Sequence, residues 1–176
     1  MKRYILTALM SLLLFAGTAF AAAPTLQPKS KEKSQVEKLM QGVARIKSDQ
    51  IDYAYISTAM FRQMFAMVGA DIASEGITIP FGSIRYLRRF ATTGMNGYRV
   101  LAEAMQPFLQ EDENVMGLEL MALNREEGNS SVIYSDKDCV LVIQDSHNDE
   151  LSVVFIAGLT YEVFIQMSEG GITFDF

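Results

Sequence analysis

The sequence has very little of the residue types that most often carry metal binding and catalysis. Its 176 residues include no tryptophan, one histidine and one cysteine. A zinc site needs about four ligands, most of them cysteine or histidine, so the usual zinc sites are excluded. His147 stands in a polar turn without the nucleophile and orienting acid of a catalytic triad. The sequence therefore predicts a protein that is not an enzyme and that has no metal or other cofactor.

A single cysteine also excludes a disulfide bond within the chain. Cys139 directly precedes the apolar run Val140 to Ile143, and a cysteine in such a run is most often buried. Asp136 and Asp138 stand just before or beside it, whereas a reactive thiol needs an exposed, electropositive setting. We therefore expect a buried and unreactive thiol.

The N-terminus has the pattern of a secretory signal peptide. Lys2 and Arg3 precede the apolar run Ile5 to Phe15, which is too short to cross ~30 Å of hydrocarbon comfortably. Ala19 and Ala21 are the small residues that a signal peptidase reads. The pattern predicts a signal peptide over residues 1–21.

We place the cleavage after Ala21, with Ala22 and Ala23 as alternative sites. Cysteine is absent near this point, so a lipoprotein anchor is not expected, and no later run is long and apolar enough to span a membrane. The sequence therefore predicts export to the periplasm, with the outer surface as an alternative.

Positive charge is scarce in the second half of the chain. Residues 107–176 carry 2 basic and 14 acidic side chains, whereas residues 22–106 carry more basic than acidic ones. Removal of residues 1–21 takes away two basic residues and no acid, so the net charge changes from −6 to −8. An acidic protein without a long basic tract is a poor candidate for nucleic-acid binding.

The segment of residues 22–50 divides into a basic leader and a short amphipathic helix. Ala22 to Lys33 is small, polar and basic, which is typical of a disordered leader. Ser34 and Glu37 have the spacing of a capping box. Apolar residues then recur with the period of a helix as far as about Lys47, and we expect this helix to dock on its own domain. Residues 51–176 are predicted to form that domain.

The stretch Asp52 to Gly69 is the segment around which we expect the domain to fold. Tyr53 and Tyr55 alternate with smaller or aliphatic residues as in a strand, and Ser57 can cap a following helix. The predicted helix carries an apolar stripe. The stripe consists of Met60, Phe61, Met64, Phe65 and Val68.

The C-terminal half alternates with a period of two from Val115 onward, which predicts strands joined by short turns. Ser83 to Ala91 is expected to be a strand, and a helix capped by Asn96 is expected to be closed by Pro107 together with Glu111 to Glu113. Another helix is expected from Thr160. The sequence thus predicts an α+β domain in which an antiparallel sheet of about five strands, a meander in the C-terminal half, packs against two or three helices.

The last strands are apolar on both faces. In Leu151 to Ala157 and in Cys139 to Ile143, hydrophobic side chains occupy successive positions instead of alternate ones. A sheet with one face in water alternates more regularly. We therefore expect the second face to be covered by the early helix, by the last helix or by another chain.

Two charged groups are candidate contacts. Arg85, Arg88 and Arg89 form a compact basic group that can grip a carboxylate or a phosphate, or can pair with the acidic half of the chain. The acidic turns are Asp136 to Asp138 and Asp145 to Glu150. Calcium needs more oxygen ligands than one turn supplies, so solvated loops are the alternative interpretation of both turns.

Tyr55 to Met60 reads Tyr-Ile-Ser-Thr-Ala-Met and resembles the Tyr-Ile-Ser-Lys-Ala-Met signature of the exported bacterial family called domain of unknown function 4252. The resemblance covers residues 35–170 and includes the apolar strand that ends at Ala157 and Gly158. Thr58 replaces the lysine of the signature, and an acidic ending of that family is absent after Gly158. The resemblance implies export to a Gram-negative envelope and no known enzyme activity.

These observations predict an exported, non-catalytic binding or regulatory module of a Gram-negative cell envelope. Its partner would be another envelope protein or a second copy of the chain. One alternative is a small-ligand carrier or hydrolase acting on envelope material, with Glu103 or Glu119 in a cleft. Another is a structural or adhesive surface protein.

Overall fold

The computed structural model describes residues 34–63, 83–146 and 148–169. Several predictions fall outside these residues. They are the signal peptide over residues 1–21, the basic leader that ends at Lys33, the part of the methionine-rich helix from Met64 onward, and the turn residue His147. The first part of that methionine-rich helix is described, because residues 58–63 are helical.

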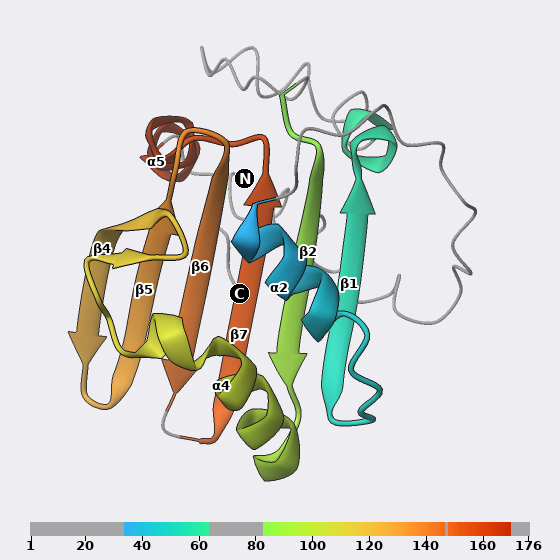
Figure 1. Ribbon diagram of the computed structural model, residues 1–176, viewed down its shortest axis with the longest axis vertical. Helices are drawn as coiled ribbons and strands as arrows, with labels where there is room; N and C mark the ends of the chain where they lie inside the picture. Colours follow the sequence, from blue (N-terminus) through green and yellow to red (C-terminus); the bar gives the residue numbers. More distant parts are fainter. Residues whose placement is uncertain (1–33, 64–82, 147, 170–176) are drawn as a thin grey trace, which may run out of the picture.

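The described residues form one seven-stranded antiparallel sheet with the strand order β1-β2-β7-β6-β5-β4-β3 (Figure 1). The strands are β1 (Ile51–Ser57), β2 (Tyr86–Thr92), β3 (Asn114–Val115), β4 (Leu118–Glu126), β5 (Asn129–Ser135), β6 (Cys139–Ser146) and β7 (Glu150–Ala157). The α+β class and the C-terminal meander are confirmed, with seven strands instead of about five. The two residues of β3 are too few to display a period in the sequence.

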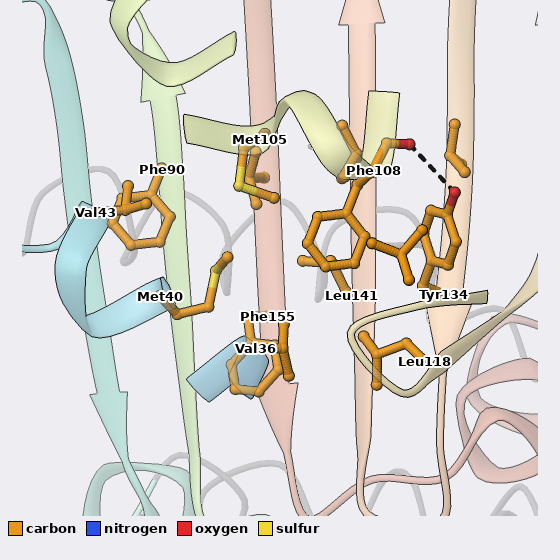
Figure 2. Packing of buried hydrophobic residues seen from close by; sticks show 14 of the residues in the cluster. Val36, Met40, Val43, Phe90, Met105, Phe108, Leu118, Tyr134, Leu141 and Phe155 are labelled. Carbon is orange, nitrogen blue, oxygen red and sulfur yellow. Dashed lines mark hydrogen bonds between the residues drawn. The ribbon is translucent and has the colours of Figure 1, made fainter. Parts of the chain in front are cut away.

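Two helices cover the first face of the sheet, α2 (Gln35–Val43) and α4 (Met95–Leu109). Figure 2 shows Val36 and Met40 of α2 and Met105 and Phe108 of α4 directed at the sheet, where they join Phe155 and others in one buried cluster. The capping box is half confirmed, because Ser34 Oγ accepts a hydrogen bond from Glu37 N at 3.2 Å. The prediction that this helix docks on its own domain is also confirmed.

The predicted start of α4 is wrong, whereas its end at Leu109 lies between Pro107 and Glu111, within the predicted closing region. Gly94, and not Asn96, occupies the N-cap position. The capping acceptor comes from a distant segment, because Gln50 Oε1 accepts from Gly97 N at 3.1 Å. Pro107 lies inside the helix, which continues to Leu109. A proline in the last turn costs one backbone bond, and burial of Phe108 on the sheet offsets that cost.

The second face of the sheet has its own buried cluster. Phe61 of the helical residues 58–63 and Phe164 of α5 (Tyr161–Glu169) pack there against Val142 and Ile156. The prediction that both faces of the apolar strands are covered is therefore confirmed. Because neighbouring residues of β6 and β7 enter different clusters, these two strands lie at the centre of the fold.

Tyr134 of β5 links the sheet to the end of α4. Its side chain is fully buried, and its hydroxyl lies 3.2 Å from both Phe108 O and Asp112 O; the first bond is the dashed line in Figure 2. These carbonyl oxygens lie at and just after the helix C-terminus, where they have no partner within the helix. Phe108 O also accepts from Glu111 N at 3.3 Å, so the contact provides the buried hydroxyl with an acceptor and joins β5 to the end of α4.

Two glycines give a test of this packing with effects of opposite sign. Gly158 has φ +84°, and a Cβ there would lie 1.9 Å from Ser83 O, so Gly158→Ala should lower the free energy of unfolding by at least about 2 kcal/mol. Gly42 lies on α2 with nothing within 4 Å of an added Cβ. Gly42→Ala should therefore raise the free energy of unfolding by about 0.5–1 kcal/mol. Urea denaturation of the two variants measures both values, and equal effects would contradict the described backbone.

Candidate functional site

A group of aromatic and basic side chains gathers on the first face of the sheet where β1 meets β2. In the register of these strands, Tyr53 lies opposite Phe90 and Tyr55 lies opposite Arg88. Residues directly opposite each other share one face of an antiparallel pair, and Phe90 belongs to the first-face core. We call Tyr53, Tyr55, Tyr86 and Arg88 the tyrosine–arginine cluster.

Arg88 is the centre of this cluster. Its Nη1 donates to the Tyr53 hydroxyl at 2.8 Å. Its guanidinium carbon lies 5.3 Å from the ring centroid of Tyr55 and 5.4 Å from that of Tyr86. These distances are within the range of cation–π attraction. Within the described ranges no carboxylate pairs with Arg88, and its buried Nε has no hydrogen-bond partner.

Two tyrosines of the cluster are exposed although their rings touch the core. Tyr53 is 42% and Tyr55 45% exposed. The ring of Tyr53 stacks on Phe90 with centroids 5.1 Å apart, and Tyr55 lies 5.9 Å from Tyr86. Burial raises the pKa of the Tyr53 hydroxyl, and the charge of Arg88 opposes that rise. The rings are therefore held in place by the sheet while much of their surface remains open to a partner.

A carboxylate from α2 fixes the inner side of the cluster. Glu37 is 9% exposed, and its Oε1 accepts from the Tyr86 hydroxyl at 3.0 Å and from Arg85 Nη2 at 3.2 Å. Arg85 Nη2 also lies 2.9 Å from Asp138 Oδ2. Burial, followed by the charge of Glu37 and its hydrogen bond, raises the pKa of Tyr86. This network ties α2 to β2 directly beside the exposed tyrosines.

The hydrogen bonds at the two ends of β1 fix the direction of its backbone groups. Thr58 N donates to Arg85 O at 3.1 Å, and Thr93 N donates to Gln50 O at 2.9 Å. Since bonded residues alternate along an antiparallel pair, the even-numbered residues of β1 direct their N–H and C=O groups toward β2. The residues that direct them away are Ile51, Tyr53, Tyr55 and Ser57. Over the described residues, β1 pairs with β2 alone. We therefore call this side of β1, which no described strand occupies, the open edge.

The opposite edge of the sheet is built differently. β4 forms the outer part of that edge, and its register with β5 shifts between Leu120 and Ala122. Charged Arg125 and Glu126 follow near its end. Bulges and charges are common ways in which proteins prevent a sheet edge from pairing with another strand. The register of β1 contains no such shift, and Asp52 is its one charged residue.

The three arginines predicted as contacts do not form one site. Arg88 joins the tyrosines, whereas Arg85 pairs with Glu37 and with Asp138 of the acidic half. Arg89 lies opposite Val154, a residue of the second-face cluster, so it lies on the other face of the sheet. Pairing with the acidic half, the alternative interpretation of this group, thus applies to Arg85.

An open depression of 470 Å³ lies elsewhere, beside the start of α4 and the turn between β4 and β5. Tyr98, Glu126, Asp145 and Asp149 are among its lining residues. The Tyr98 hydroxyl donates to Asp145 Oδ2 at 3.1 Å, and burial, then Asp145, raises its pKa. The carboxylates proposed for a catalytic cleft, Glu103 and Glu119, are not among its lining residues.

The acidic turn from Asp136 to Asp138 has a structural use. Asp136 Oδ1 accepts from Asp138 N and from Cys139 N, both at 2.7 Å. No group of three metal-ligating side chains occurs among the residues that the structure describes. Cys139 is buried, and burial, followed by the neighbouring carboxylates, raises the pKa of its thiol. The prediction of a buried thiol is confirmed, and its environment disfavours the reactive thiolate.

Comparison of the chain with protein-family models, with curated proteins and with solved structures gave no match. The described helices include none that combines the length and apolar character needed to cross a membrane. What the site can do is therefore inferred from its own residues.

The sequence interpretation did not recognise Tyr53 and Tyr55 as site residues. Their alternation with Ala54 and Ile56 indicated a strand, and it also places both tyrosines on one face. The missing information was the position of that strand at an edge, beside Arg88. That position depends on the pairing of β2 with β7, which joins residues far apart in the chain.

Removal of the Tyr86 hydroxyl tests the contact between α2 and β2. Tyr86→Phe should lower the free energy of unfolding at neutral pH by about 1–2 kcal/mol, because the bond to Glu37 is charge-assisted. The pKa of Tyr86 lies above the ordinary value of 10.0 in the folded protein. The stability that this proton provides is complete below about pH 10 and is lost as the pH rises through the folded pKa.

The wild type should therefore lose stability above about pH 10 more steeply than Tyr86→Phe. Urea denaturation at pH 7 and at alkaline pH measures the difference. Tyr55→Phe is the matched control at neutral pH, because the Tyr55 hydroxyl forms no hydrogen bond with any described residue and Tyr55 is 45% exposed. Identical alkaline slopes for the wild type and Tyr86→Phe would contradict the assignment.

Proposed function

We propose that the protein is an exported, non-catalytic binding module of a Gram-negative cell envelope, and that it binds a protein partner along the open edge of β1. One observation carries the proposal. Tyr53 and Tyr55 are exposed beside Arg88, which lacks a carboxylate partner in the described part of the chain, and their backbone groups face the open edge.

A partner strand at this edge would use two kinds of interaction. Its backbone would bond to the outward N–H and C=O groups of β1, which is how extended segments add to sheets. Its side chains on the first face would contact the tyrosine rings and the guanidinium of Arg88. Tyrosine and arginine are enriched among the residues that carry most of the binding energy at protein interfaces. Affinity would come from the edge, and selectivity from the cluster.

The proposal of export rests on the N-terminal sequence pattern and on the resemblance of Tyr55 to Met60 to the signature of the domain of unknown function 4252. The proposal that catalysis is absent rests on the scarcity of histidine and cysteine. A carrier or hydrolase would require a cleft with convergent polar groups. A surface adhesin would be recovered on the outer face of the cell, and fractionation separates that alternative from a periplasmic module.

Site-specific photo-crosslinking in intact cells tests the binding surface. A photoreactive phenylalanine analogue in place of Tyr55 should capture a defined polypeptide. The same analogue in place of Val100, which is 38% exposed on α4, should capture none. Tyr53→Lys combined with Arg88→Met should reduce capture at position 55 at least about tenfold, because the anchors of an interface carry most of its energy.

Thermal melting of each variant checks that the fold is retained. Leu123→Lys is the matched charge control, since Leu123 is 42% exposed on the opposite edge strand β4. Capture that is as strong at Val100 as at Tyr55, or that survives the double substitution, would count against the β1 edge as the binding surface.

Processing of the N-terminus tests export separately. The intact mass of the protein recovered from the periplasm should correspond to a chain that begins at Ala22, after the loss of residues 1–21. A chain that begins at Met1 and remains in the cytoplasm would refute the proposed location and leave the binding surface to be judged by crosslinking.

A further inference from the structure

We propose that the partner at this edge is a second copy of the chain, which pairs with β1 antiparallel about a two-fold axis at Ala54. This inference rests on the proposed function, because it names the occupant of the same edge. The resulting dimer would join two seven-stranded sheets into one continuous sheet.

The backbone of β1 is symmetric in the way that self-pairing requires. The strand runs from Ile51 to Ser57, so Ala54 is its middle residue. The outward-facing residues are the odd-numbered ones, and they lie at equal distances on either side of Ala54. When Ala54 lies opposite Ala54 of the second copy, Tyr53 lies opposite Tyr55 and Ile51 opposite Ser57. Every outward N–H and C=O group of the strand then meets a complementary group.

The side chains of β1 are compatible with this register. On the first face, Tyr53 and Tyr55 of each copy would form a group of four rings, two on each strand, and cover the surface that is open in the single chain. On the second face, Asp52 would lie opposite Ile56, and the small Ala54 opposite itself. No two like charges face each other, and direct like-charge pairs are what destabilise a strand pairing.

Arg88 also permits the pairing. In the joined sheet the two Arg88 residues are separated by the two β1 strands, because each arginine lies on β2. Three strand spacings amount to about 14 Å, which exceeds the screening length of ~8 Å at physiological ionic strength. Each guanidinium would therefore flank the group of four tyrosine rings without appreciable repulsion from the other.

The two edges of the sheet explain why the assembly would stop at two copies. Pairing of β1 with β1 uses the same surface on both chains, so it closes after one contact. Pairing of β1 with β4 would instead leave new open edges and extend without limit. The register shift between Leu120 and Ala122 and the charges at Arg125 and Glu126 disfavour that contact.

Cysteine crosslinking reports the register directly. In an antiparallel pair, residues opposite each other without mutual hydrogen bonds have Cα atoms about 4.5 Å apart, which lies within the range that a disulfide spans. Ala54→Cys should therefore form a covalent dimer under mild oxidation. Asp52→Cys is the matched control on the same face, because its counterpart would lie about 13 Å away along the strand. The native Cys139 is buried and does not interfere.

Sedimentation of the mature wild type from low to high micromolar concentration gives an independent measure. A dimer is expected, and Tyr53→Lys combined with Tyr55→Lys should weaken it at least about tenfold by placing like charges opposite each other. Leu123→Lys on β4 should leave the dimer unchanged. Thermal melting confirms that each variant folds.

The outcomes separate this inference from the proposed function. A wild-type monomer at every concentration overturns self-pairing, and so does a dimer in which Ala54→Cys fails to crosslink or Asp52→Cys crosslinks equally well. If self-pairing fails but photo-crosslinking at Tyr55 still captures a different envelope polypeptide, the binding function stands. If the protein is monomeric and nothing is captured at Tyr55, both are overturned.

Discussion

The fold depends on the burial of β6 and β7 on both faces. Successive residues of these strands, such as Val154 and Phe155, enter two separate hydrophobic clusters, one on each side of the sheet. A strand of this kind is stable only when both of its faces are removed from water. The helices α2 and α4 cover one side, and α5 with residues 58–63 covers the other. The positions of the helices thus follow from the requirement that both faces of the central strands be buried.

Because both faces of the central strands are covered, the outer strands are the parts of the sheet that can meet a partner. The two edges differ in regularity and in charge. The register shift and charges of β4 disfavour pairing with another strand, whereas the regular edge of β1 permits it. At β1 the ladder is regular and its outward groups lie beside aromatic rings. The network of Glu37, Tyr86 and Arg85 connects that edge to α2 and to the core. The edge is therefore preorganised, which reduces the entropy lost when a partner is ordered on it.

Local patterns in the sequence predicted most of the elements because their causes are local. The period of two marked the strands from Leu118 to Ala157, and Ser34 marked the start of α2. Contacts between distant segments were not predictable in this way. Gln50 caps α4 from outside the helix, and the pairing of β2 with β7 decides that β1 is an edge. The candidate site is made by such distant contacts, so the arginines were identified as candidates while their tyrosine partners were missed.

The buried thiol of Cys139 would have a consequence in the oxidising compartment to which we propose that the protein is exported. Thiol–disulfide exchange requires a thiolate with access to another sulfur atom. Burial and the neighbouring carboxylates disfavour the thiolate of Cys139, and burial beside β7 keeps other sulfur atoms away while the sheet is intact. The folded chain is thereby protected from mixed disulfides. Modification of this sulfur requires separation of the central strands. The rate at which an alkylating reagent modifies Cys139 therefore reports how often these strands open.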